Sequence, residues 1–129
     1  MTRSVSEISA LLLKAGRGAG LSLGACEDLA MAAGAFEPSD LAQVAAMLQT
    51  PQGCAQIEAL CLAFDLGGSG DLSILASVFE RAKSPVPAGP RDVPEDVIDG
   101  LSELAARTFV PASDASRDGG AGSGLSDND

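Results

Sequence analysis

Apolar residues recur with helical spacing in several short segments, and glycine or proline separates each segment from the next. In the first segment, Ile8, Leu11, Leu12 and Ala15 follow the i, i+3, i+4, i+7 pattern of one buried helical face. Alanine and leucine supply most of the apolar content, whereas Trp and Tyr are absent, which favours closely packed helices over a β-sandwich. The sequence therefore predicts a mainly α fold, a small bundle of about five to six short helices.

Signals for helix ends place these helices along the chain. Ser4 and Glu7 have the spacing of a capping box, so a helix is expected from Val5 to Arg17. The glycines of GRGAG, residues 16–20, are expected to end it, because glycine readily adopts the left-handed conformation of a helix exit. Further helices are expected from about Ser22 to Gly34, after a cap at Ser39, around Ile57–Phe64, from about Ser73 and after Pro94.

The predicted domain organisation is simple. Residues 1–110 are expected to form a single helical domain, with residues 84–94, SPVPAGPRDVP, as an extended proline-rich linker inside it. Residues 111–129 are rich in glycine and aspartate and poor in apolar side chains, so a flexible C-terminal arm is expected there. The first residues do not have the pattern of a signal peptide, since the apolar run is short and follows Glu7.

Charge and composition exclude several classes of function. Eight basic against 18 acidic residues give a net charge of −10, which repels nucleic-acid phosphates and anionic membrane surfaces, so neither is expected as a partner. Histidine is absent, which excludes imidazole bases, Ser-His-Asp and Cys-His catalysis and His-ligated zinc. Any catalysis would depend on carboxylates, Lys14, Lys83, a thiol or a cofactor, and no cofactor is indicated.

The three cysteines, Cys26, Cys54 and Cys61, form no metal-type pair and cannot all be bridged. Nothing in the sequence near Cys54 or Cys61 would lower a thiol pKa, so inert packing is expected for them. Cys26 lies close to a helix start, where a slightly activated thiol is conceivable, although packing is favoured. Together the cysteines indicate buried thiols in a reducing cytoplasm.

One segment has part of the spacing of a calcium loop. In FDLGGSGDLS, residues 64–73, Asp65, Ser69 and Asp71 fall at positions one, five and seven of an EF-hand loop. Position three is a glycine and position twelve an alanine, so two of the charged ligands that the cation needs are missing. An ordinary loop between helices is predicted, with a degenerate calcium-binding module as the alternative.

The last helix carries carboxylates spaced by three and four residues, which could share a metal ion or act as an acid–base pair. A solvated acidic face is the commoner cause of this spacing, and it is the prediction here. The carboxylates concerned are Asp92, Glu95, Asp96, Asp99 and Glu103.

The segment GRGAG also has a second interpretation. Successive backbone N–H groups at Gly18 and Gly20, with Arg17 as counter-charge, could bind an anion. The segment lacks the lysine of a phosphate-binding loop and no strand precedes it, so a glycine-rich turn between helices is favoured.

The two ends of the chain carry a family resemblance. They are RGAGLSLGACEDLA, residues 17–30, and RTFVPASDASRDGGAGSGLSDND, residues 107–129. This combination resembles an uncharacterised bacterial family, a domain of unknown function, whose members share the RGAG segment and a GAG-G and DND tail. The matching parts cover about a third of the chain, which is similar to a shortened member. The resemblance implies no activity.

The resemblance does favour a role for the tail. We hypothesise that the glycine-rich arm, with Gly122 and Gly124, delivers Asp127, Asn128 and Asp129 to a pocket near Arg17 or on a partner. Plain disorder is the alternative.

The expected function is that of a small cytoplasmic accessory or protein-interaction module that has no catalytic residue, with an unidentified protein partner. A carboxylate-based enzyme or enzyme subunit, with or without a divalent metal, is the first alternative. The degenerate EF-hand-like module is the second.

Overall fold

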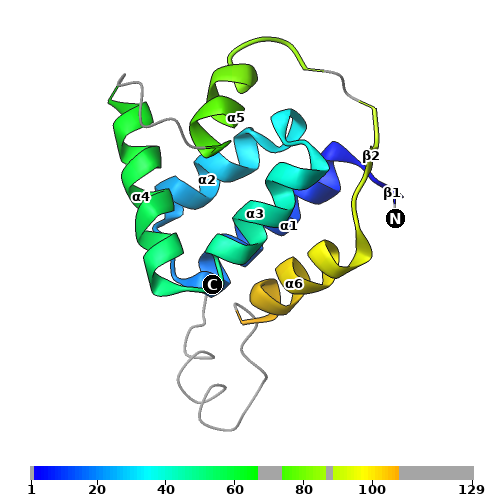
Figure 1. Cartoon of the computed structure of the whole chain (residues 1–129), viewed down its shortest axis with the longest axis horizontal. Coiled ribbons are helices and arrows are strands. Elements are labelled where there is room, and N and C mark those ends of the chain that lie inside the picture. Colours follow the sequence, from blue (N-terminus) through cyan, green and yellow to red (C-terminus); the bar gives the residue numbers. More distant parts are fainter. Residues whose placement is uncertain (1, 67–73, 87–88, 108–129) are drawn as a thin grey trace, which may run out of the picture.

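The computed structural model describes residues 2–66, 74–86 and 89–107, and these residues are mainly helical (Figure 1). Within them, six α-helices confirm the predicted fold class and helix number. The elements in chain order are β1 (Thr2–Arg3), α1 (Val5–Ala19), α2 (Leu23–Met31), the 3₁₀ helix η1 (Ala33–Ala35), α3 (Pro38–Met47), α4 (Pro51–Asp65), α5 (Ile74–Ala82), β2 (Arg91–Asp92) and α6 (Glu95–Ala106).

Helix α1 begins at the predicted capping box. The Ser4 hydroxyl accepts a hydrogen bond from the Glu7 amide at 3.1 Å, and the Glu7 carboxylate accepts one from the Ser4 amide at 3.0 Å. These two bonds satisfy amides that a helix start would otherwise leave without partners. The hydrogen bond from the Ser4 amide also lowers the pKa of Glu7, because it stabilises the ionised carboxylate.

The glycines of GRGAG do not form the predicted turn. Helix α1 continues through them to Ala19, and only Gly20, with φ of 98°, has the left-handed conformation of a helix exit. Gly16 and Gly18 are helical and mark close packing instead. A Cβ on Gly16 would lie 2.9 Å from the Cys26 sulfur, and one on Gly18 would overlap the Leu104 carbonyl oxygen of α6. At these two positions, glycine therefore allows α1 to pack closely against α2 and α6.

Helix α3 begins two residues before the predicted Ser39 cap. Glu37 is the cap residue, and its amide donates to the Asp40 carboxylate at 2.9 Å. Pro38 takes the first helical position, where its fixed φ suits the helix and its missing N–H costs nothing. Ser39 is exposed within the first turn.

The proline-rich linker is held to the start of the chain by a short strand pair that sequence patterns did not indicate. Thr2 pairs with Asp92 and Arg3 with Arg91 in an antiparallel two-stranded sheet. This pairing brings α6 next to α1, so that the last described helix packs on the first (Figure 1).

One hydrophobic core joins the described helices. Leu12, Leu29 and Phe36 are almost completely buried, as are Leu101 and Leu104 of α6. Helix α1 contacts both α2 and α6, so it lies at the centre of the packing. None of the described helices is long and apolar enough to cross a membrane. The predicted C-terminal arm, 111–129, and the predicted domain boundary at 110 lie outside the described residues.

Candidate functional site

Large apolar side chains are exposed along α2 and α4, which lie against each other in the fold. Among the described residues, four of the five exposed large apolar side chains belong to this region: Leu23 and Met31 on α2, Leu62 on α4, and Leu66 just after it. Met31 is 83% exposed and Leu66 79%, so neither side chain is part of the hydrophobic core. Large apolar side chains that are this exposed are typical of surfaces that bind another molecule. We call this region the α2–α4 groove.

Two adjoining hollows form the groove, and both are lined by Asp65. The first, of about 220 Å³, lies between Asp28, Met31 and the aromatic rings of α4 and α5. The second, of about 480 Å³, extends past Ser22 and Glu58 to Leu62. A depression lined by exposed apolar side chains, Met31 and Leu62, and by carboxyl groups is a surface suited to another chain rather than to a small enclosed ligand.

Two carboxyl groups meet where the hollows join. Burial raises the pKa of Asp28 to about 6, and the neighbouring Asp65 carboxyl contributes by a hydrogen bond and by its charge. As a carboxylate, Asp28 leaves its buried Oδ2 without a hydrogen-bond partner among the described residues. A proton on the Asp28 carboxyl allows it to share a hydrogen bond with Asp65, because two adjacent carboxylates repel each other.

An aromatic pair forms the wall of the first hollow. The rings of Phe64 and Phe79 have centroids 5.0 Å apart and are tilted by 45°. The Lys83 ammonium lies 4.8 Å from the centroid of the Phe64 ring and forms a 3.0 Å ion pair with Glu80. This hollow therefore already holds one cation over an aromatic face, an arrangement that favours positive groups.

The acidic residue Glu58 of α4 caps α2. Its carboxylate accepts hydrogen bonds from the Ser22 amide at 2.6 Å and from the Ser22 hydroxyl at 2.7 Å. The Ser22 hydroxyl in turn accepts from the Ala25 amide at 3.2 Å. The negative charge faces the positive end of the α2 dipole, which fixes the two walls of the groove relative to each other.

The cysteines behave as packing residues. Cys26 and Cys61 are buried, Cys54 is half-buried, and all three are free. Burial raises the pKa of each thiol, that of Cys61 to about 12, where the nearby Asp28 and Asp65 charges add to the effect. Since the thiolate is the reactive form, these thiols are poor nucleophiles. The expected burial is confirmed for Cys26 and Cys61, and their inertness stays a prediction.

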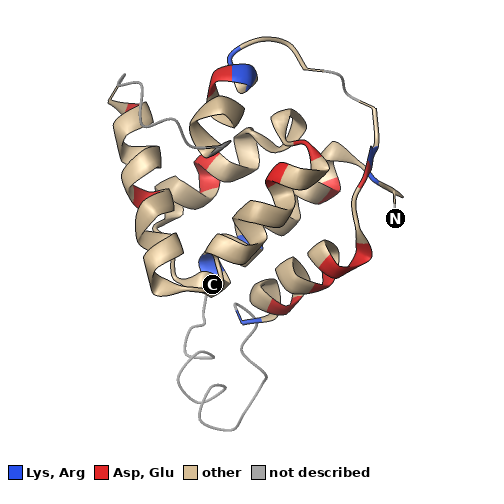
Figure 2. Ribbon diagram, viewed as in Figure 1, with Lys and Arg blue, Asp and Glu red and all other residues tan. Residues whose placement is uncertain are grey.

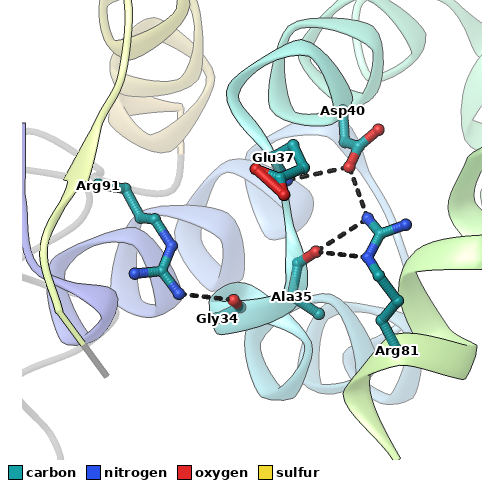
Figure 3. A network of polar contacts seen from close by, with 6 residues as sticks. All are labelled: Gly34, Ala35, Glu37, Asp40, Arg81 and Arg91. Carbon is teal, nitrogen blue, oxygen red and sulfur yellow. Dashed lines mark hydrogen bonds and ion pairs between the residues drawn. The ribbon is translucent and has the colours of Figure 1, made fainter. Parts of the chain in front are cut away.

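A second cleft, on the side of η1, is occupied by structural contacts. Figure 3 shows Arg81 and Arg91 approaching consecutive carbonyl groups. Arg81 donates to the Ala35 carbonyl at 2.9 Å and to the Asp40 carboxylate at 2.7 Å, and Arg91 donates to the Gly34 carbonyl at 2.9 Å. The two guanidinium groups thus anchor α5 and the linker to η1.

The residues predicted for an anion site do not surround a common cavity. Arg17 is exposed on α1, Gly18 packs against α6, and Gly20 ends the helix. The backbone amides of residues 16–19 lie within a helix and near its C-terminus, the negative end of its dipole. The tail residues of that hypothesis, Gly122, Gly124, Asp127, Asn128 and Asp129, lie outside the described residues.

Of the three candidate calcium ligands in residues 64–73, only Asp65 lies within the described residues. Asp65 is the last residue of α4 and lies with Asp28, whereas Ser69 and Asp71 fall outside the described residues. Within the described part of the chain, no group of three or more Cys, Asp or Glu side chains is arranged to hold a metal ion.

The acidic residues of α6 face solvent, as predicted. Figure 2 shows acidic positions repeated along the α6 ribbon. Asp92 of β2, just before the helix, is exposed, and so are Glu95, Asp96, Asp99 and Glu103 of α6. They form no described metal site, and the solvated acidic face is the interpretation that fits.

Sequence patterns did not identify the meeting of Asp28 with Asp65. The two residues lie 37 positions apart, and Asp28 has the ordinary position of an acid in a short helix. A usable signal was present in the apolar pattern: Leu62 and Leu66 fall outside the inward stripe of α4. Apolar residues on the outer side of a helix indicate a surface that another molecule covers.

Comparison with known proteins agrees with the N-terminal part of the resemblance. No curated protein and no solved structure matches the chain. The C-terminal part of the resemblance lies beyond the matched segment and stays a prediction. Residues 3–51, from β1 to the first residue of α4, match the model of a family described as "Protein of unknown function (DUF3726)", so this part of the chain is similar to members of that family.

Proposed function

We propose that this protein is a non-catalytic interaction module whose α2–α4 groove binds a basic, amphipathic helix of a partner protein. The observation that carries the proposal is that an exposed apolar side chain lines each hollow, Met31 the first and Leu62 the second, beside the carboxyl groups of Asp28 and Asp65. Apolar side chains of a partner helix would cover Met31 and Leu62. Its lysines or arginines would neutralise Asp28 and Asp65, which ends the repulsion between them.

Charge selects this type of partner over others. The chain has a net charge of −10, and the groove has carboxylates from both of its helices. An acidic helix would be repelled, and a neutral one would leave the carboxyl pair buried without a counter-charge. Two free, buried thiols support placing the interaction in a reducing compartment such as the cytoplasm.

A designed peptide tests the proposal with the full chain. The probe is an 18-residue helix of Leu and Lys with leucine at i, i+3, i+4 spacing, labelled for fluorescence anisotropy, about five turns long. A Leu–Glu peptide of the same pattern controls for hydrophobicity alone. The protein variants are Met31→Ser/Leu62→Ser in the groove and, as the matched control, Val86→Ser at an exposed apolar residue outside it.

The Leu–Lys peptide is expected to bind the wild-type chain and the Val86→Ser variant equally, and the groove variant at least about tenfold more weakly, since each buried leucine contributes strongly to such interfaces. The Leu–Glu peptide is expected not to bind. Equal affinity for the groove variant and the wild type would show that charge attraction alone accounts for binding, and would refute the proposal.

A carboxylate-based site is the second candidate, because Asp28 and Asp65 form a pair in which one pKa is raised to about 6. A divalent cation that binds the pair should raise the melting temperature of the native state by mass action. The measurement is a Mg²⁺ or Ca²⁺ titration followed by circular dichroism. A rise that disappears in Asp28→Asn/Asp65→Asn supports this candidate, and its absence in the wild type refutes it.

A further inference from the structure

Three cations at one end of the molecule have no acidic partner within the described residues: Lys14, Arg17 and Arg107. All three are exposed. The other described cations are engaged, in the ion pairs Arg3–Glu7, Arg81–Asp40 and Lys83–Glu80 and in the hydrogen bonds of Arg91 to carbonyl groups. Because acidic residues outnumber basic ones by 18 to 8, most cations of this chain have an acid available to pair with. Three exposed cations without an acidic partner in the described part of the chain therefore call for an explanation.

Packing between α1 and α6 brings these three residues to the same place. Lys14 and Arg17 lie one helical turn apart on α1. At Gly18 the two helices approach so closely that a Cβ there would lie 3.3 Å from the Cβ of Arg107, the residue after α6. Figure 2 shows basic residues at the ends of both helices. We call Lys14, Arg17 and Arg107 the basic end.

A groove with a mixed lining continues from the basic end along the two helices. It has a volume of about 280 Å³, and its lining includes Leu11 and Ile98 as well as the ion pair of Arg3 with Glu7. An extended segment that pairs its acids with the basic end therefore has both apolar and polar surface beside it, with one acid, Glu7, in the lining. The helix dipole explains one cation at each of the two helix ends, but it does not explain Lys14 or the convergence of all three.

We propose that the basic end binds the acidic segment 111–129 of the same chain. This segment contains four aspartates, Asp114, Asp118, Asp127 and Asp129, against a single basic residue, Arg117. It starts four positions after Arg107, so its attachment point is at the binding surface itself. Its glycines allow the backbone to approach a surface closely, which supports the idea that aspartates at 127 and 129 reach α1.

Tethering makes this interaction effective although each ion pair is exposed. Exposed ion pairs are individually weak and are screened by salt over about 10 Å at 0.1 M. A short tether raises the local concentration of the segment to about the millimolar range, which favours contacts within one chain over contacts with a second copy. The segment is therefore expected to be bound at low salt and released at high salt. This proposal is independent of the α2–α4 groove.

The test uses nuclear magnetic resonance of the full ¹⁵N-labelled chain. Amide chemical shifts and heteronuclear NOE values are followed for Gly119–Gly124 and Asp127–Asp129 at about 20 and about 500 mM salt, on either side of the Debye-screening range. The first variant is Lys14→Ser/Arg17→Ser/Arg107→Ser. The second is Asp127→Asn/Asp129→Asn, which leaves the described helices unchanged. Lys83→Ser, at an exposed cation elsewhere, is the matched control.

In the wild type and the Lys83→Ser variant, we expect NOE values near residues 127–129 to be raised at low salt and to fall at high salt. Both test variants should show the low values at either salt concentration. Equal values in the wild type and both test variants would refute the proposal. A raised NOE that depends on protein concentration would refute it too, because the segment would then bind a second copy.

Discussion

Helix pairs α1–α6 and α2–α4 are built from similar small and aliphatic residues, yet one pair is closed and the other open. Gly18 lets the backbone of α1 touch the carbonyl of Leu104 in α6, and α1–α6 is the most extensive helix contact described. Between α2 and α4, Leu62 is 61% exposed and the floor contains carboxyl groups. The close contact in the first pair requires a glycine, whereas the second pair has large apolar side chains exposed at its surface.

The difference separates residues that hold the fold from residues available for binding. In the closed pair, a side chain added at Gly18 would meet the backbone of Leu104, and a backbone cannot move aside as a flexible side chain can. In the open pair, the side chains at the rim contribute little to stability and are accessible to a partner. Stability measurements on matched substitutions in the two regions should therefore give opposite results.

The largest expected effect contrasts the two sides of α4. Ile57 is completely buried, so Ile57→Ala should lower the free energy of unfolding by about 2–5 kcal/mol, the cost of a core cavity. Leu62→Ala on the outer side should change it by less than about 0.5 kcal/mol. Urea unfolding followed by circular dichroism measures both. Similar losses for the two variants would mean that Leu62 is part of the core and that the groove is closed.

The next effect contrasts two glycines of the closed pair. Gly18→Ala should destabilise by about 1–3 kcal/mol, because its Cβ overlaps backbone atoms of Leu104. Gly100→Ala, in α6 with nothing within 4 Å of its Cβ, should stabilise by about 0.5–1 kcal/mol through helix propensity. Melting temperatures of the two variants should shift in opposite directions. A stabilising Gly18→Ala substitution would show that the two helices are not in contact there.

The smallest effect concerns the carboxyl pair of the open groove and depends on pH. The pKa of Asp28 is raised from 3.8 to about 6 in the fold, so the folded state retains a proton that the unfolded state has lost. Stability contributed by this group is therefore present below about pH 4 and is lost as pH rises to about 6.

Asp28→Asn removes that loss, and it should stabilise the protein at pH 7 by about 1 kcal/mol, a value that allows for solvent screening of a partly exposed group. At pH 3.5 the variant and the wild type should be equally stable, since Asp28 is protonated in both states. The measurement is urea unfolding at the two pH values. An equal stabilisation at both would show that charge on Asp28 is not the cause.

Much of the local structure followed from the sequence because its causes are local. The Ser4–Glu7 capping box and the inward residues Leu41 and Val44 of α3 are set by contacts within one or two helical turns. The prediction was wrong at Ser39, because Glu37, two residues earlier, is the cap, with Pro38 and Asp40 in the first turn. It was also wrong for GRGAG, since a glycine needed for a turn and one needed for close packing look alike in a sequence.

The candidate site was predicted only in part, because its residues come from separate elements. Asp65 was named as a candidate calcium ligand, but no site was predicted at its neighbour in the fold, Asp28. Arg17 was identified without Lys14 and Arg107 beside it. Which helices become neighbours depends on the whole core, and no spacing along one helix contains that information.

By itself, the sequence determined that this chain is helical, where α1 and α2 begin, and which chemistry its lack of histidine excludes. Those properties depend on backbone propensity, capping and composition, which act over a few residues. Only the tertiary structure decided that Asp28 meets Asp65, that Gly18 joins α1 to α6, and that Leu62 remains exposed. These outcomes depend on burial and on charge at contacts between residues far apart in the chain, where the free energy belongs to the pair rather than to either residue.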